Sequence, residues 1–150
     1  MDKSIKMCAL YIATLTAMSI IHHHSHWLTK GKTFYGDHLL FERIYDSSLE
    51  DLDAAAEKFI GVLGEGCLDY DLQTDLLHRV LLKYENLEGS PQQMSFSIER
   101  DFLKLGEALR VLLDDEDKLS MGVDDLLASI ASNRETAVYL LQQSLDGESE

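Results

Sequence analysis

The sequence predicts an all-α protein folded as a single helical bundle. Apolar residues recur at intervals of three and four along most of the chain, and strand-like alternation is absent from it. Proline occurs once, and glycine is concentrated near residues 61–66 and at Gly89, which leaves long stretches free for helices. With 150 residues, of which 45% are hydrophobic, the chain can bury a sizeable core, so we treat residues 1–150 as one domain.

Four long helices and one short helix account for this pattern. Gly31 ends the first helix, and the glycines of 61–66 end the second. The short helix would lie across the connection between the two halves of the bundle, and Ser90-Pro91 marks the start of the next long helix. After the last helix, residues 147–150 should fray. The expected helices cover about residues 3–29, 33–61, 71–84, 91–114 and 123–145.

The first expected helix has some features of a secretory signal. Its apolar stretch from Met7 to Ile21 follows Lys3 and Lys6, but polar residues interrupt it at helical intervals and it continues directly into a run of histidines. We therefore interpret it as a helix of the mature protein, too short and too polar to span a membrane. No membrane association is expected.

The cysteines and the net charge argue against several classes of function. Cys8 and Cys67 lie in unrelated segments without ligand spacing, which argues against a disulfide framework and a thiolate zinc site and fits a reducing, cytoplasmic compartment. The chain has 27 acidic and 13 basic residues, and its formal net charge is −14. Such a surface disfavours binding to nucleic acid phosphates and attracts cations.

Histidine and acids on the second helix have the spacing of metal ligands. His38 and Glu42 are four residues apart, as are Asp53 and Glu57, so each pair lies on one helix face with about 6 Å between its members. Relative to His38, the three acids fall at about 40°, 60° and 100° around the helix axis. Glu42 and Asp53 are nevertheless roughly 16 Å apart along that axis, too far to bind one metal ion. Antiparallel pairing of two chains about a two-fold axis would join the halves into two equivalent sites.

A run of histidines at the end of the first helix leads into this region. His26 is the candidate ligand, and His23, one turn earlier, is expected to support it. His22 and His24 point elsewhere and are expected to be solvated. Trp27 adjoins His26, and its alternative role is ordinary packing in the core or an interface. For the acids, the alternative interpretation is a solvated helix face.

Motifs across this region resemble those of a known family. The resemblance is to the Dps family of mini-ferritins, which are stress-linked iron-storing proteins, and it covers residues 23–64 without an insertion. It implies a ferritin-like four-helix bundle with a short extra helix in the middle connection. The matching motifs are His26-Trp27, Gly31-x-x-Phe34, His38-x-x-Phe41-Glu42, Tyr45-Asp46 and Asp53-x-x-Ala56-Glu57.

The resemblance also implies a function. Fe(II) would bind at sites shared between two-fold-related subunits of a hollow dodecamer, be oxidised preferentially by hydrogen peroxide, and be stored as ferric mineral. The protein would thus be a cytoplasmic ferroxidase that limits oxidative stress, with iron as its metal. The ligands would be His26, His38 and Glu42 from one subunit, and Asp53 and Glu57 from the other.

Two more roles follow from the resemblance. Trp27 would be a catalytic residue beside the site, where the family's tryptophan intercepts radical equivalents. Asp124 and Asp125 would line pores through which iron enters at three-fold axes. Nitrogen and carboxylate ligands with open positions suit Fe(II) and leave room for peroxide.

The resemblance leaves three alternative functions. Family members that condense DNA usually use a lysine-rich terminal extension, whereas this chain begins near its first helix with Lys3 and Lys6 and ends in the acidic segment 146–150. Strong direct DNA binding is therefore not expected without a local patch or a cation bridge, by which nucleoid association could still occur. DNA compaction remains one alternative, and a structural cage or nucleoid- or virion-associated packing protein with little iron turnover is another. An intrasubunit di-iron protein would need Glu-x-x-His pairs, which this sequence lacks.

Overall fold

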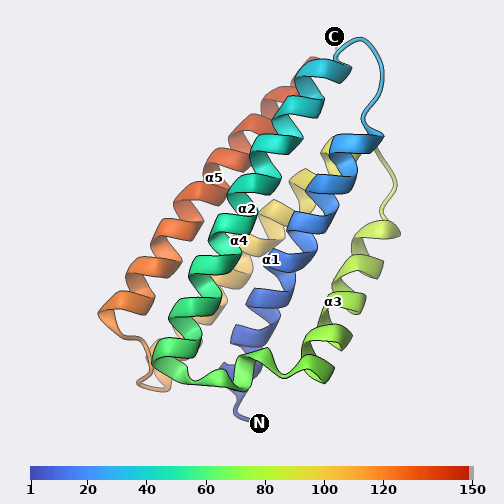
Figure 1. Ribbon diagram of the computed structural model, residues 1–150. Coiled ribbons are helices and arrows are strands. Elements are labelled where there is room, and N and C mark those ends of the chain that lie inside the picture. The colour runs from blue at the N-terminus through green and yellow to red at the C-terminus, as the bar shows by residue number, and fades with distance from the viewer. Residues whose placement is uncertain (149–150) are drawn as a thin grey trace.

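The computed structural model describes residues 1–148 and confirms the all-α class (Figure 1). Every expected helix is present, with ends within a few residues of those predicted, and the described residues contain no strand. α5 continues through residues 147 and 148, so the fraying expected there is wrong, and residues 149–150 lie outside the described residues. The elements are α1 (Lys3–Leu28), α2 (Phe34–Leu63), the 3₁₀ turn η1 (Glu65–Leu68), α3 (Tyr70–Glu85), α4 (Pro91–Asp115) and α5 (Met121–Glu148).

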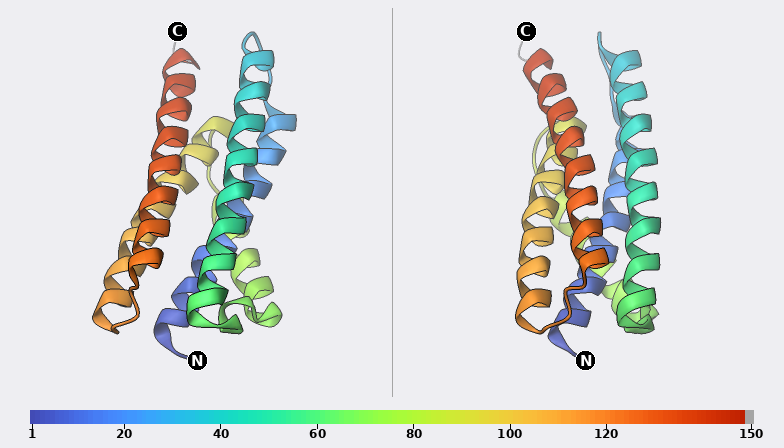
Figure 2. Two further views of the ribbon diagram at one scale, coloured as in Figure 1. Left: turned by 60° about the vertical axis from the view of Figure 1, so that its left-hand side comes forward. Right: turned by 90° about the vertical axis from the view of Figure 1, so that its left-hand side faces the viewer.

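The four long helices form two antiparallel pairs packed face to face. Figure 2 shows α1 with α2 in one layer and α4 with α5 in the other. Because α2 and α4 run in the same direction, the chain must return along the bundle between them, and η1 and α3 occupy this return (Figure 1). One long crossover in a four-helix bundle is the ferritin-like topology, and the short helix lies in the middle connection as predicted.

α1 is the central helix of the core because it packs against α2, α3 and α4. The Tyr11 ring contacts those of Phe59 and Phe102, with centroids 5.6 and 4.5 Å apart. Among residues 1–148, α1 alone has the length and apolar composition that could cross a membrane, which corrects the expectation that this segment is too short and too polar. However, 67% of its most apolar stretch is buried in the bundle, so packing accounts for the composition.

Candidate metal centre

The loop between α1 and α2 brings His26 and His38 into contact. The imidazole Nδ1 of each donates a hydrogen bond to the backbone carbonyl of the other, and both N···O distances are 2.6 Å. The rings stack with centroids 3.5 Å apart and an interplanar angle of 16°. A carbonyl oxygen only accepts, so each Nδ1 carries a proton, and the neutral form of each ring compatible with this bond has its lone pair on Nε2. This tautomer is the one in which Nε2 can bind a metal ion.

A buried carboxylate anchors the first turn of α2, directly before His38. Asp37 is 8% exposed and accepts hydrogen bonds from Thr33 at 2.7 Å, from Gln92 at 3.1 Å and from Ser144 at 3.0 Å. These donors lie before α2, on α4 and on α5. Asp37 therefore joins three helices at this end of the bundle and fixes the position from which His38 projects.

Aromatic side chains surround the histidine pair. The ring centroid of His23 lies 4.3 Å from that of Trp27 and 4.4 Å from that of Tyr45. The rings of Tyr45 and His26 are nearly perpendicular, at 80°, with centroids 5.5 Å apart. His23 thus lies where a supporting residue was expected. Trp27 is 60% exposed, so it is not a core residue of the single chain. Sequence reasoning missed Tyr45 as part of this group because its position fits the apolar stripe of α2 equally well.

The acids of the candidate site lie apart from each other along α2. Glu42, Asp53 and Glu57 are exposed, and α2 is unbroken over Phe34–Leu63. Asp53 is therefore held roughly 16 Å along the axis from Glu42. Within residues 1–148, no three histidine, cysteine, aspartate or glutamate side chains form a group that could hold a metal ion. One chain thus brings together the two histidines and leaves the Asp53/Glu57 pair remote from them.

The helix flank that carries these acids also exposes large apolar side chains. Tyr35, Leu39 and Leu49 are 71%, 44% and 48% exposed. Relative to His38 they fall at about 60°, 100° and 20° around the axis, within the same sector as the three acids. Exposed apolar residues gathered on one helix face are typical of a surface that contacts another protein.

The prediction that His22 is solvated is wrong. Its side chain is completely buried, with Nε2 3.0 Å from Glu99 and Nδ1 3.0 Å from the Ser95 hydroxyl. Because successive residues turn by 100° around a helix, His22 faces the core one turn after Met18 while His24 faces solvent. The polar run from His22 to His26 therefore contains two inward-facing residues, His22 and Ser25.

His22 belongs to an ionic network that sequence reasoning missed. The buried Arg134 places Nε 3.1 Å from Glu99 and a terminal nitrogen 3.0 Å from Asp51, so α1, α2, α4 and α5 each contribute one residue. Burial raises the pKa of Asp51, while the hydrogen bond from Asn133 and the charge of Arg134 act in the opposite direction. The burial of Arg134 could have been predicted from its position in the sequence. It lies four residues after Ile130 and three before Ala137, on the same apolar face of the helix.

Comparisons with known proteins find sequence similarity over most of the chain. No family model matches the sequence. The chain is 27% identical over 135 residues to general stress protein 20U of Bacillus subtilis, across 89% of this chain and 91% of that protein. It is 23% identical over 125 residues to DNA protection during starvation protein 2 of Bacillus anthracis, across 83% of this chain and 84% of that protein. The likeness thus extends well beyond residues 23–64.

Proposed function

We propose that this chain, a homologue of Dps-family proteins over most of its length, is a mini-ferritin that oxidises Fe(II) with hydrogen peroxide and stores the ferric product. The observation that carries the proposal is the His26–His38 pair, which holds two imidazoles with both Nε2 lone pairs available. The names of the two relatives, which refer to general stress and to DNA protection during starvation, support a protective role. The location that we propose for it is the cytoplasm.

The complete site would form between two copies of the chain. Antiparallel pairing along α2 would set His26, His38 and Glu42 opposite Asp53 and Glu57 of the partner subunit, and the two-fold axis would generate a second, equivalent site. Leu49 supports this arrangement because it is exposed on the same flank, between the His38/Glu42 pair and the Asp53/Glu57 pair. Closure of such pairs into a hollow dodecamer is the assembly that the family resemblance implies.

The donor set suits iron as a substrate. Imidazole nitrogen and carboxylate oxygen both bind Fe(II), and additional carboxylates favour the Fe(III) product. Two Fe(II) ions give one electron each, and hydrogen peroxide takes both electrons and two protons as its O–O bond breaks, which leaves two Fe(III) ions and two water molecules. Delivery of both electrons within one interface avoids the hydroxyl radical that a single electron would release from peroxide.

Trp27 is suited to intercept a radical equivalent that escapes this reaction. Its ring contacts His23, whose ring in turn contacts Tyr45 beside His26. Because Trp27 is 60% exposed, an oxidised indole could be reduced again from solution. This role supports protection but is not required for the oxidation of iron.

Direct binding to DNA is not part of the proposal. The net charge of −14 disfavours contact with phosphates, and DNA can be protected without contact if iron and peroxide are consumed elsewhere. Of the two proposed pore residues, Asp124 is bound by Arg110 at 2.7 Å, which neutralises its charge in this chain. Asp125 is exposed and is the better candidate for a pore acid.

The test is anaerobic loading with Fe(II) followed by peroxide, with ferric absorbance and hydroxyl-radical yield as readouts. Glu57→Gln removes one carboxylate charge with little change in shape, and we expect oxidation to slow by about tenfold or more while assembly persists. Glu85→Gln on α3 removes the same charge outside the site and should leave the rate unchanged. Wild-type oxidation no faster than in buffer would favour the structural cage instead.

A further inference from the structure

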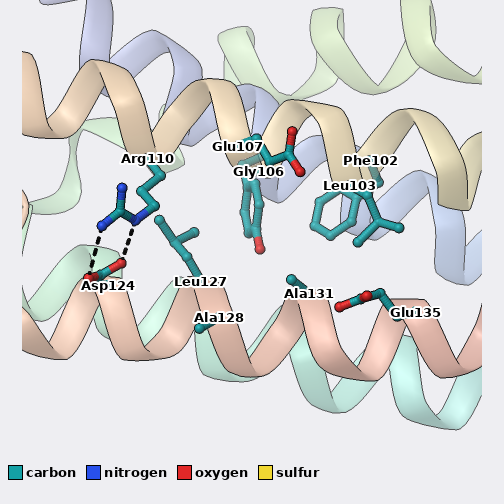
Figure 3. Close-up of a pocket in the computed structure, with 11 residues that line it drawn as sticks. Phe102, Leu103, Gly106, Glu107, Arg110, Asp124, Leu127, Ala128, Ala131 and Glu135 are labelled. Carbon is teal, nitrogen blue, oxygen red and sulfur yellow. Dashed lines mark hydrogen bonds and ion pairs between the residues drawn. The ribbon is translucent and has the colours of Figure 1, made fainter.

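A groove between α4 and α5 forms a pocket of about 250 Å³ that shares no residue with the candidate metal centre (Figure 3). Gly106 on α4, which has no side chain, and Ala128 and Ala131 on α5, which have only a methyl group, line this space and leave it open. The rings of Tyr11 and Phe102 lie at its base, with Leu103 and Leu127 at the sides. The groove therefore combines an aromatic surface with aliphatic walls.

Tyr11 brings a polar group to this apolar surface. Its side chain is 1% exposed and packs against Phe102, yet among residues 1–148 its hydroxyl makes no hydrogen bond. Burial raises the pKa of Tyr11 far above its ordinary value, so the hydroxyl stays protonated and can both donate and accept. The hydroxyl is not one of the fully enclosed polar atoms of the bundle, and Tyr11 lines the pocket, so a ligand in this space could form a hydrogen bond with it.

The rim of the groove has a net negative charge. Arg110 and Asp124 form a bidentate ion pair at one end, with N···O distances of 2.7 and 3.3 Å, and their charges cancel. Glu107 on α4 and Glu135 on α5 lie on the two walls, and neither forms an ion pair within the part of the chain that the structure describes (Figure 3). Two carboxylates without cationic partners thus border the aromatic base.

We propose that this groove binds a small organic cation of the arylalkylamine class. The flat apolar part would lie over Tyr11 and Phe102, and the ammonium group would lie near Glu107 and Glu135. An ammonium group close to aromatic faces and carboxylates is favoured by cation–π and charge attraction, whereas an anion would be repelled. The volume is slightly below the roughly 300–1,000 Å³ of pockets for drug-sized ligands, so a single ring with a short amine arm fits best.

The probe for this proposal is 2-phenylethylamine, added to the assembled protein without iron. Saturation-transfer NMR and calorimetry would measure its binding, with 2-phenylethanol as the neutral analogue of similar size. We expect the alcohol to bind at least tenfold more weakly, and the binding of the amine to weaken as salt screens the carboxylates. Competition between the two compounds would show that they share a site.

Three variants locate the binding. Ala128→Leu would fill the groove from an exposed helical position and abolish binding, and Glu107→Gln combined with Glu135→Gln would weaken it at least tenfold. Tyr11→Phe would remove the hydroxyl alone and weaken binding several-fold. The matched control combines Glu85→Gln with Glu88→Gln, which makes the same change in net charge outside the groove and should leave binding unchanged.

Each other outcome would overturn the proposal. Equal losses in the two double variants would show that the amine pairs loosely with the acidic surface as a whole. Undiminished binding to Ala128→Leu, or no saturation transfer at millimolar amine, would exclude the groove as a cation site. Circular dichroism and thermal unfolding of every variant would show that its fold is intact.

Discussion

The guanidinium of Arg134 forms an ion pair with the carboxylate of Asp51 at 3.0 Å inside the bundle, which joins α5 to α2. Arg134 is completely buried, and Glu99 lies 3.1 Å from it on α4, the other helix of its own antiparallel pair. Removing charges from water is costly, so such a pair need not stabilise the fold more than apolar residues of similar volume would. The loss of one partner, however, leaves a charge buried without compensation.

Arg134→Met tests this network because it removes one cation between two buried carboxylates. We expect the free energy of unfolding to fall by about 3–5 kcal/mol, as is typical when one member of a buried ion pair is deleted. Urea unfolding at fixed protein concentration would measure the change. Arg79→Met, which breaks the exposed pair with Asp75, should cost less than about 1 kcal/mol. Equal losses of unfolding free energy in the two variants would contradict the expectation that the buried ion pair is more sensitive to the loss of one partner than the exposed pair.

Alkaline pH should destabilise the protein through Cys8. Burial, and to a lesser extent the neighbouring Cys67, raises the pKa of the Cys8 thiol from 9.0 to about 12. Between these values the unfolded chain loses the thiol proton and the folded chain keeps it. The contribution of Cys8 to stability is therefore complete below pH 9 and falls as pH rises toward 12, by up to about 1.4 kcal/mol per pH unit.

Cys8→Ala should lack this contribution to the pH slope. Comparison of urea unfolding for the two proteins at pH 8, 9 and 10 isolates the thiol, because all other groups titrate in both. The stability curves should converge as pH rises if the wild type is more stable at pH 8. Parallel curves would refute the role of the thiol.

Leu49→Asp should prevent the pairing of two copies along α2. Leu49 lies between the His38/Glu42 pair and the Asp53/Glu57 pair and is 48% exposed. A negative charge there would repel the acids of the partner subunit. Sedimentation should show a smaller assembly, and peroxide-dependent iron oxidation should fall in parallel. Leu82→Asp on α3, which is 40% exposed, is the matched control. Normal assembly and oxidation by Leu49→Asp would exclude the antiparallel α2 interface.

Asp37→Ala should loosen the start of α2 and displace His38. The substitution leaves Gln92 and Ser144 without their shared acceptor, and we expect a loss of about 1–3 kcal/mol in unfolding free energy. Iron oxidation should slow more than in Ser144→Ala, which removes one of these hydrogen bonds and keeps the other. A variant that unfolds earlier but oxidises iron at the wild-type rate would separate Asp37 from the metal centre.

Trp27→Phe should alter the radical yield without altering the rate of iron oxidation. Phenylalanine keeps a ring beside His23 but is much harder to oxidise than indole. A spin trap present during peroxide addition should therefore report more hydroxyl radical at an unchanged rise in ferric absorbance. If the trap signal stays at the wild-type level, Trp27 is a surface residue without a protective role.

The helices and their ends could be predicted from local signals, because apolar periodicity, the glycines near residue 64 and Ser90-Pro91 act within a few residues. The spacing of His38/Glu42 and Asp53/Glu57, which we propose as ligand pairs, is a local signal of the same kind. The partner of His22 could not be predicted, since Glu99 lies 77 positions further along the chain. The contact between His26 and His38 depends on the path of a short loop, and the groove beside Gly106 depends on how α4 and α5 pack. Such features arise from tertiary structure rather than from spacing.

The reciprocal hydrogen bonds between His26 and His38 hold the end of α1 against the start of α2. Each side chain forms a hydrogen bond with the backbone of the other segment, so both imidazoles have restricted rotamers before a metal ion binds. The entropy of ordering these two side chains is lost during folding rather than during capture. The two imidazoles should therefore form a preorganised pair of metal ligands. A longer loop at residues 29–33 should change the affinity for metal even though no ligand is altered.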